Sequence, residues 1–256
     1  FSDRLLYLLF LRNDVSPAPN AIAIDYRENA LQRMNAHAFE KVQKTTEEFS
    51  RLGLLTRIGV LEEGRSFKGI PKVNLTGNWK KQLPAVQKKS LAEATESGTF
   101  LSETKEISLT PREKKIIVVT PRTEALSGAS DLHGKILHAT GITTPQTISI
   151  SSLDGKPLSE SRKILMFHLV NMGNQFQSFR NRECTILDSY GTRPLLIERR
   201  KTTVSLHLPH KWKVETLDLS GRQTGTVKTD YEDGVLLFTA DTALRPHGVM
   251  AYLLTR

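Results

Sequence analysis

The residues best suited to chemistry in this chain are its seven histidines. His133 and His138 lie five residues apart, so on one strand their rings point to opposite faces. His207 and His210 lie three apart, and they converge only if the intervening proline bends the strand. Because a zinc site needs three or four ligands, we expect no metal site and no bound cofactor. His168 falls inside a predicted strand, and we interpret it as a packed histidine and not as a catalytic one.

Carboxylates are the other candidates, since hydrolysis of a glycosidic bond needs two of them about 5 Å or about 6.5–9.5 Å apart. Their spacing in the sequence gives no reason to pair any two, and we interpret them as surface charges. The chain also has no GxGxxG, Walker-type, HExxH, CxxC or GxSxG motif. We therefore assign no catalytic residue. The carboxylates that surround the central strands are Glu160, Glu183, Asp188 and Glu198.

Two aromatic residues are candidates for carbohydrate binding, because the apolar faces of pyranose rings stack on exposed aromatic platforms. Trp212 is flanked by Lys211 and Lys213, and Tyr190 is the second candidate. For Trp212 the alternative is that strand alternation turns it into the core, and we favour that alternative. Binding of a polysaccharide or oligosaccharide requires one of these rings to be exposed beside polar side chains.

The composition describes an ordinary folded protein with a basic surface. Apolar residues make up 38% and charged residues 25% of the 256 residues, which allows one large domain or two smaller ones. The formal net charge is +9. Because Lys and Arg are spread along the chain among acidic residues, whereas nucleic-acid binders concentrate them on one face, we expect no nucleic-acid partner. No apolar run is long enough to span a bilayer, and the single Cys184 excludes an internal disulfide.

The first zone, residues 1–61, has α/β character. We interpret its opening, FSDRLLYLLFLRND, as an apolar helix and not as a signal peptide, because Asp3 and Arg4 interrupt the apolar run. With no initiating Met, this opening agrees with a chain that begins within a longer protein. A strand at AIAI, a helix over residues 28–51 that ends near Gly53, and a strand at LLTRIGV form one βαβ unit.

The second zone, residues 62–98, is weakly patterned and rich in Gly, Pro and Lys. It is predicted to be a linker with a short helix near Ala85 to Ala94. The third zone, residues 99–256, is a succession of short strands with turn signals between them. Within it, Thr143 to Val170 is predicted to form two strands joined by a tight turn. The turn signals are His133-Gly134, Asp154-Gly155, Ser220-Gly221 and Asp233-Gly234.

Many short strands with glycine turns and no long helix indicate an antiparallel sheet protein. The predicted fold class is mainly β, with an antiparallel β-sandwich of the immunoglobulin-like or jelly-roll type, preceded by a small α/β segment.

Several segments, in order along the chain, resemble the carboxyl-terminal part of large bacterial glycoside hydrolases of the (β/α)8-barrel type. SSLDGKPLSESRKIL and VTPRTEA are the most specific of them. Asn13 departs from the Gly that the family has before Asp14, and a left-handed turn tolerates this change. The remaining segments are LLFLRNDVSPAPNAIAI, LGLLTRIGV, IIVVTPRTEALSG, ISISSLDGKPLSESRKILMFHLVNMGNQ, GTRPLLIERRKTTVSLHL and VETLDLSGRQTGTV.

The resemblance implies that residues 1–61 are the trailing edge of a catalytic barrel region and that residues 99–256 are its appended β-sandwich. In such enzymes the acid/base and nucleophile glutamates lie at carboxyl ends of barrel strands, and no residue here matches them. The resemblance therefore implies a non-catalytic accessory portion of a glycoside hydrolase, with the catalytic barrel of the same polypeptide as its partner. It also favours a secreted, periplasmic or cell-surface location.

Three interpretations of the sandwich stay open. As a packing domain it buttresses the barrel and presents an apolar face without an exposed aromatic platform. As a carbohydrate-binding module it exposes Trp212 or Tyr190 and adds affinity by tethering. As a cell-surface adhesion or scaffold domain it has no enzyme attached, and residues 1–61 pack as a complete unit. We favour them in that order, because the opening helix is apolar on too many sides to face water alone.

Overall fold

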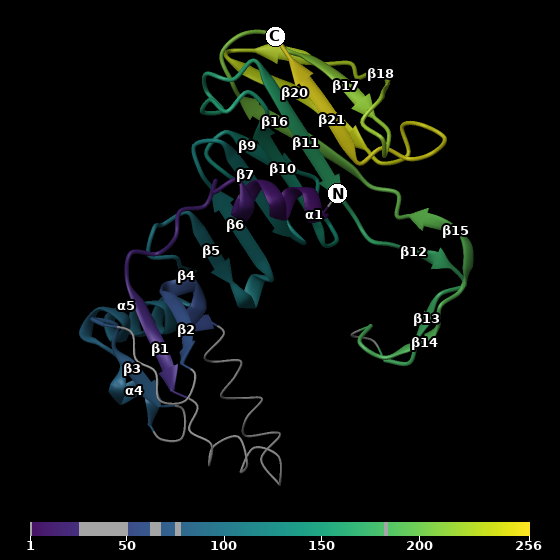
Figure 1. Cartoon of the computed structure of the whole chain (residues 1–256). Coiled ribbons are helices and arrows are strands. Elements are labelled where there is room, and N and C mark those ends of the chain that lie inside the picture. Colours follow the sequence, from purple (N-terminus) through teal and green to yellow (C-terminus); the bar gives the residue numbers. More distant parts are fainter. Residues whose placement is uncertain (1, 26–50, 62–67, 75–77, 182–183) are drawn as a thin grey trace. The chain divides into compact units, whose positions relative to one another are not determined.

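The computed structural model describes residues 2–25, 51–61, 68–74, 78–181 and 184–256 (Figure 1). The chain divides into two compact units, one made of Phe1–Asp14 with Lys115–Arg256 and the other of Val15–Lys114. These boundaries differ from the predicted ones at residues 61 and 98. The opening helix belongs to the sandwich unit, and the predicted linker supplies a strand and two helices to the smaller unit.

The smaller unit is built on a parallel sheet in the order β2-β1-β3, as the βαβ pattern predicts. Most of the predicted helix over residues 28–51 lies outside the described residues. Residues 51–55 are helical, so Gly53 lies within a helix, and the prediction that it ends one is wrong. The sheet strands are β1 (Ala21–Asp25), β2 (Arg57–Leu61) and β3 (Lys72–Asn74).

The rest of the smaller unit is helical before it returns to β-structure. The predicted short helix is confirmed and runs longer than expected, following Pro84 and ending at Gly98, whose φ of 70° is left-handed. Among the described residues of this unit, nine buried side chains form a core, and Ile22, Val73 and Trp79 belong to it. The remaining elements are α4 (Trp79–Gln82), α5 (Ala85–Ser97), β4 (Phe100–Leu101), β5 (Ile107–Thr110) and η2 (Pro111–Glu113).

The larger unit is an antiparallel β-sandwich, which confirms the predicted fold class. Among its described residues, one sheet has the order β18-β17-β21-β11-β10-β7-β6 and the other has the order β19-β20-β16-β9-β8. The first sheet consists of β6 (Lys115–Val119), β7 (Thr123–Gly128), β10 (Gln146–Ser152), β11 (Lys163–Leu169), β17 (Lys213–Leu217), β18 (Gln223–Thr226) and β21 (Ala251–Thr255). The second consists of β8 (Leu132–His133), β9 (Leu137–Thr140), β16 (Lys201–His207), β19 (Asp230–Glu232) and β20 (Val235–Asp241).

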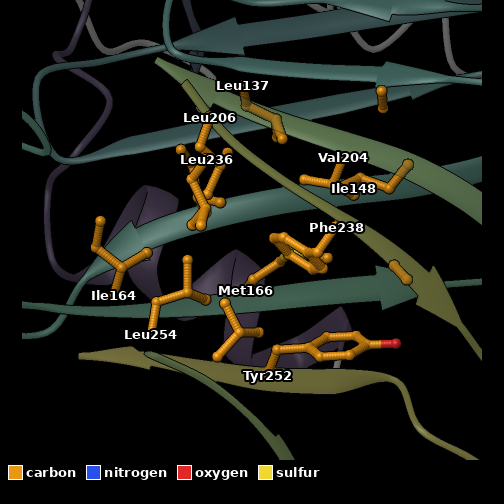
Figure 2. Packing of buried hydrophobic residues seen from close by; sticks show 14 of the residues in the cluster. Leu137, Ile148, Ile164, Met166, Val204, Leu206, Leu236, Phe238, Tyr252 and Leu254 are labelled. Carbon is orange, nitrogen blue, oxygen red and sulfur yellow. The ribbon is translucent and has the colours of Figure 1, made fainter. Parts of the chain in front are cut away.

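The core of the sandwich lies between these sheets, and in the second sheet the more and the less buried side chains alternate along β9, β16 and β20. In β16 the side chains of Thr202, Val204 and Leu206 are buried, while those of Thr203 and His207 are exposed. Figure 2 shows how residues from both sheets pack together in one cluster. It labels Leu137, Val204, Leu206, Leu236 and Phe238 from the second sheet, and Ile148, Ile164, Met166, Tyr252 and Leu254 from the first.

The glycine turns are confirmed at Asp233-Gly234, where φ is 48° and 80° and β19 pairs directly with β20. The predicted tight turn at Asp154-Gly155 is wrong. β10 and β11 do pair antiparallel, but residues 153–162 connect them. Asp154 organises this longer loop by accepting hydrogen bonds from Ser161 Oγ at 2.9 Å and the Arg162 N–H at 2.7 Å.

Candidate docking surface

Residues 171–198 leave the sandwich between β11 and β16 as a narrow arm. Its inner part pairs β12 (Met172–Gln175) with β15 (Thr192–Ile197), and its outer part pairs β13 (Ser178–Phe179) with β14 (Leu187–Ser189), both antiparallel. Figure 1 shows this arm extending away from the two sheets. Each ladder has two strands among the described residues, and the inner strand β15 borders residues 242–248, which line one cavity together with residues 194–197.

Seven large apolar side chains of the arm are exposed to solvent. In β15 five of six residues are exposed, where a strand of a sandwich has every second residue buried. Exposed apolar surface marks a site of interaction with another molecule where it is large, and the number of such side chains on one short segment makes the arm a candidate for such a site. The exposed side chains are Met172, Phe176, Phe179, Ile186, Tyr190, Leu195 and Leu196.

The opening helix is a second source of exposed apolar surface on the same unit. It consists of α1 (Ser2–Leu6) and one π-helical turn, η1 (Tyr7–Leu11). Leu5, Leu8 and Leu9 are buried. The side chains on its other sides, Leu6, Tyr7, Phe10 and Leu11, are exposed.

A buried carboxylate, Asp14, fastens this helix to the sandwich. Its side chain is fully buried and forms ion pairs with Arg12 and with Arg122, the latter at 2.7 Å. Thr123 Oγ1 donates a further hydrogen bond to it at 2.6 Å. Arg12 Nη1 in turn donates to the carbonyl of Ser152 at 2.6 Å. The exposed face of the helix is therefore held in a fixed position on the sandwich unit.

The structure does not bring the two predicted carbohydrate-binding aromatics together. Trp212 lies in the sandwich core, 4% exposed, and its Nε1 donates to the carbonyl of Pro209 at 3.3 Å. The Arg256 guanidinium lies 5.4 Å from its ring centroid. Trp212 therefore offers no platform, as the core alternative predicted. Tyr190 is 78% exposed and lies between β14 and β15 on the arm.

The histidines are arranged differently from the prediction. His168 is fully buried, as expected of a packed histidine. His133 and His138 do not lie on one strand: they are directly paired across β8 and β9, with ring centroids 5.1 Å apart. The centroid of His207 lies 4.6 Å from that of His138. Burial lowers the pKa of His138, and the neighbouring His207 and His133 lower it further, while a backbone hydrogen bond at Gly134 acts in the opposite direction.

Three of the four carboxylates interpreted as surface charges are described, and they have separate surroundings. Asp188 forms an ion pair with Arg180 at 3.0 Å on the arm, and Glu198 forms one with Arg200. Glu160 is exposed, and Glu183 lies outside the described residues.

The buried carboxylates are ones that the sequence did not single out. Besides Asp14, Glu124 is 1% exposed and accepts hydrogen bonds from the N–H groups of Ile136 and Leu137, both at 2.9 Å. Burial raises the pKa of the Glu124 carboxyl, and these backbone N–H groups oppose the shift. The carboxylate thus ties β7 of one sheet to the start of β9 in the other, which is a structural role.

The bend of the arm depends on Gly191, and this gives a testable prediction. Its φ is 68°, and an added Cβ would lie 2.2 Å from the carbonyl oxygen of Gln175 and 2.5 Å from the N–H nitrogen of Gln177. We expect Gly191→Ala to disrupt the pairing of β12 with β15 and to speed amide hydrogen exchange in residues 171–198, while exchange in the sandwich strands stays unchanged. Gly221→Ala is the control, since Gly221 also has a positive φ, 84°, but open space around it. Unchanged exchange in the arm of Gly191→Ala would contradict this account.

Comparison of the chain with protein-family models, with curated protein sequences and with solved structures returned no match. Among the described residues, no helix has the length and apolar character needed to cross a membrane.

Proposed function

We propose that this chain is the non-catalytic accessory portion of a glycoside hydrolase, and that its sandwich unit buttresses a catalytic (β/α)8 barrel. One observation carries the proposal: the arm and the opening helix together present eleven large apolar side chains to solvent. A surface of this size is costly to leave in water and is stabilised when a partner covers it. The resemblance of the sequence to the carboxyl-terminal part of such hydrolases supports a barrel as that partner.

The geometry of the two surfaces agrees with docking and not with core packing. Most of the described side chains of the arm are exposed to solvent. The exposed side chains of the opening helix are held in position on the sandwich, because Asp14 next to that helix forms ion pairs with Arg12 and Arg122. If the chain were an adhesion domain, residues 1–61 would pack without leaving apolar side chains in contact with solvent. Tyr7, Phe10 and Leu11 are exposed, which argues against the adhesion alternative.

If the exposed arm residues serve docking, they contribute little to the stability of the isolated chain. We expect the double variant Tyr190→Ser, Leu195→Ser to change the free energy of unfolding by less than about 0.5 kcal/mol, and to bind clearly less of the apolar dye ANS than the wild type. Leu237→Ser is the matched control, since Leu237 is an exposed leucine on β20, outside the arm. A loss of stability well above that limit would show that the arm is folded back in solution.

The partner itself is tested by photo-crosslinking in cells that encode this chain. With p-benzoylphenylalanine in place of Tyr190, we expect a crosslinked product whose peptides come from a (β/α)8-barrel hydrolase domain. The same probe in place of Thr203, exposed on β16, should give no such product. Crosslinking of position 190 to an unrelated protein contradicts the proposal. So does hydrolysis of 4-nitrophenyl glycosides by the purified chain.

Sugar binding is the second candidate function, and the exposure of Tyr190 favours it. Phe176, also on the arm, is 75% exposed, and both rings are open to stacking with pyranose faces. Calorimetric titration with oligosaccharides tests this candidate. Binding that Tyr190→Ala removes, with the fold intact by circular dichroism, supports a carbohydrate-binding arm. Binding that persists in Tyr190→Ala assigns the sugar to another surface.

A further inference from the structure

Three histidines gather on the outer face of the five-stranded sheet, on adjacent strands β8, β9 and β16. His133 and His138 are cross-strand partners. On the other side of β9, His138 pairs with Ser205, which places His207 diagonally two residues further along β16. Their strand neighbours Leu132, Leu137 and Leu206 point into the core, so the three imidazoles project together on the opposite face.

Two of the three separations between the rings are those of imidazoles that share one ion. Metal–nitrogen bonds of about 2.0–2.1 Å, at angles of about 90–110°, place the centroids of two ligating imidazoles about 4.5–5.2 Å apart. The observed centroid separations are 5.1 Å for His133 and His138 and 4.6 Å for His138 and His207. His138 is the central member, since both short separations involve it.

The backbone beneath the rings is rigid, while two of the rings are free to turn. The N–H of His207 donates to the carbonyl of Ile136 at 2.9 Å, which locks β16 to the turn that joins β8 and β9. Among the described residues no three His, Cys, Asp or Glu side chains are already in position to hold a metal ion. Binding therefore requires rotation of side chains, and His133 and His207 are exposed, so their rings can change rotamer without disturbing the core.

We propose that His133, His138 and His207 together bind one divalent transition-metal ion of the Zn²⁺ and Cu²⁺ class. Neutral imidazole nitrogen is a preferred ligand of these ions and a poor one for Ca²⁺ or Mg²⁺. Three protein ligands on an open sheet face leave a coordination position for water or for a group from another molecule. The site lies on the sandwich sheet and not on the arm, so it is independent of the proposed docking function.

Calorimetric titration with ZnCl₂ tests the site, in a Cys184→Ser background that removes the exposed thiol. We expect one Zn²⁺ per chain and a rise of Tm with added Zn²⁺. Both His138→Ala and His207→Ala should weaken binding by more than about tenfold. His247→Ala is the matched control, since His247 is an exposed histidine outside the cluster, and should bind as the parent does. Circular dichroism checks the fold of each variant. Because the His207 side chain is exposed, His207→Ala leaves the hydrophobic core unchanged.

Electron paramagnetic resonance of the Cu²⁺-loaded chain counts the ligands. Superhyperfine splitting from three imidazole nitrogens, lost in His138→Ala and kept in His247→Ala, supports the site. Splitting from one nitrogen, absence of Zn²⁺ binding at micromolar concentration, or binding that is unchanged in both cluster variants would overturn it.

Discussion

Replacement of Asp14 by alanine is expected to lower the free energy of unfolding of the sandwich unit by about 3 kcal/mol. The fully buried carboxylate accepts from Arg12, Arg122 and Thr123, and its removal leaves two guanidinium groups without their counter-charge. The two arginine side chains are 19% and 31% exposed. Water can therefore partly solvate them, and the effect should lie at the lower end of the range for a fully buried pair.

Urea unfolding followed by tryptophan fluorescence measures this effect. Trp212 lies in the sandwich core and Trp79 in the core of the smaller unit, so a Trp79→Phe background reports on the sandwich alone. Asp233→Asn is the control, since Asp233 occupies a hairpin turn at φ 48°, which asparagine tolerates, and should change stability by less than about 0.5 kcal/mol. Faster hydrogen exchange in residues 2–14 of Asp14→Ala should accompany the loss. A change below about 1 kcal/mol would show that the ion pairs contribute little.

The second large effect is a loss of stability in mild acid that His168 causes. Burial, the larger cause, lowers the pKa of His168 from 6.5 to about 4, and the Asp241 carboxylate acts in the opposite direction. Its Nε2 lies 2.6 Å from Gln146 Oε1, which also accepts from Thr202 Oγ1 at 2.9 Å. Its Nδ1 has no hydrogen-bond partner. The folded state therefore holds this imidazole neutral.

The direction of the pH effect follows from the two protonation states. Below pH 6.5 the unfolded chain takes up a proton at this position, while the folded chain resists doing so until about pH 4. The contribution to stability is complete above pH 6.5 and is lost as the pH falls through this window, by about 2 kcal/mol between pH 7 and pH 5. Urea unfolding at pH 7, 6 and 5 measures it.

His168→Gln is the informative variant, because it keeps a polar side chain near Gln146 and removes the titrating group. Its stability should fall by about 2 kcal/mol less than that of the wild type between pH 7 and pH 5. Other titrating groups are common to both proteins and cancel in this difference. His247→Gln controls for the removal of an imidazole and should keep the wild-type difference. Equal pH dependence of wild type and His168→Gln would contradict a neutral buried His168.

Local signals in the sequence predicted the elements well where neighbouring residues determine them. Asp233-Gly234 formed its hairpin because both residues adopt left-handed φ angles at low cost. The helix that follows Pro84 ends at Gly98, because glycine readily adopts the left-handed conformation that terminates a helix. Gly53 failed as a stop signal, since glycine is permitted within a helix and does not by itself end one.

The spacing of residues along the sequence could not predict which strands pair with each other. His133 and His138 were placed on opposite faces on the assumption of one strand. A turn between them instead made them cross-strand partners, and β16 brought His207 beside them from about seventy residues away in the chain. Asp14, in the segment after the opening helix, met Arg122 and Thr123 because that helix packs on the sandwich. Side chains that are distant in sequence meet through the order of strands in a sheet, which no local pattern contains.

The sequence by itself determined the mainly β fold class, the packing of His168 and the turn at Asp233-Gly234, and it favoured a buried Trp212, because these signals act over a few residues. Only the tertiary structure decided that the opening helix belongs to the sandwich, that residues 171–198 form an exposed arm, and that three imidazoles meet on one sheet. These features depend on which surfaces remain uncovered once every strand has its partners. That is a property of the whole packed unit and not of any segment.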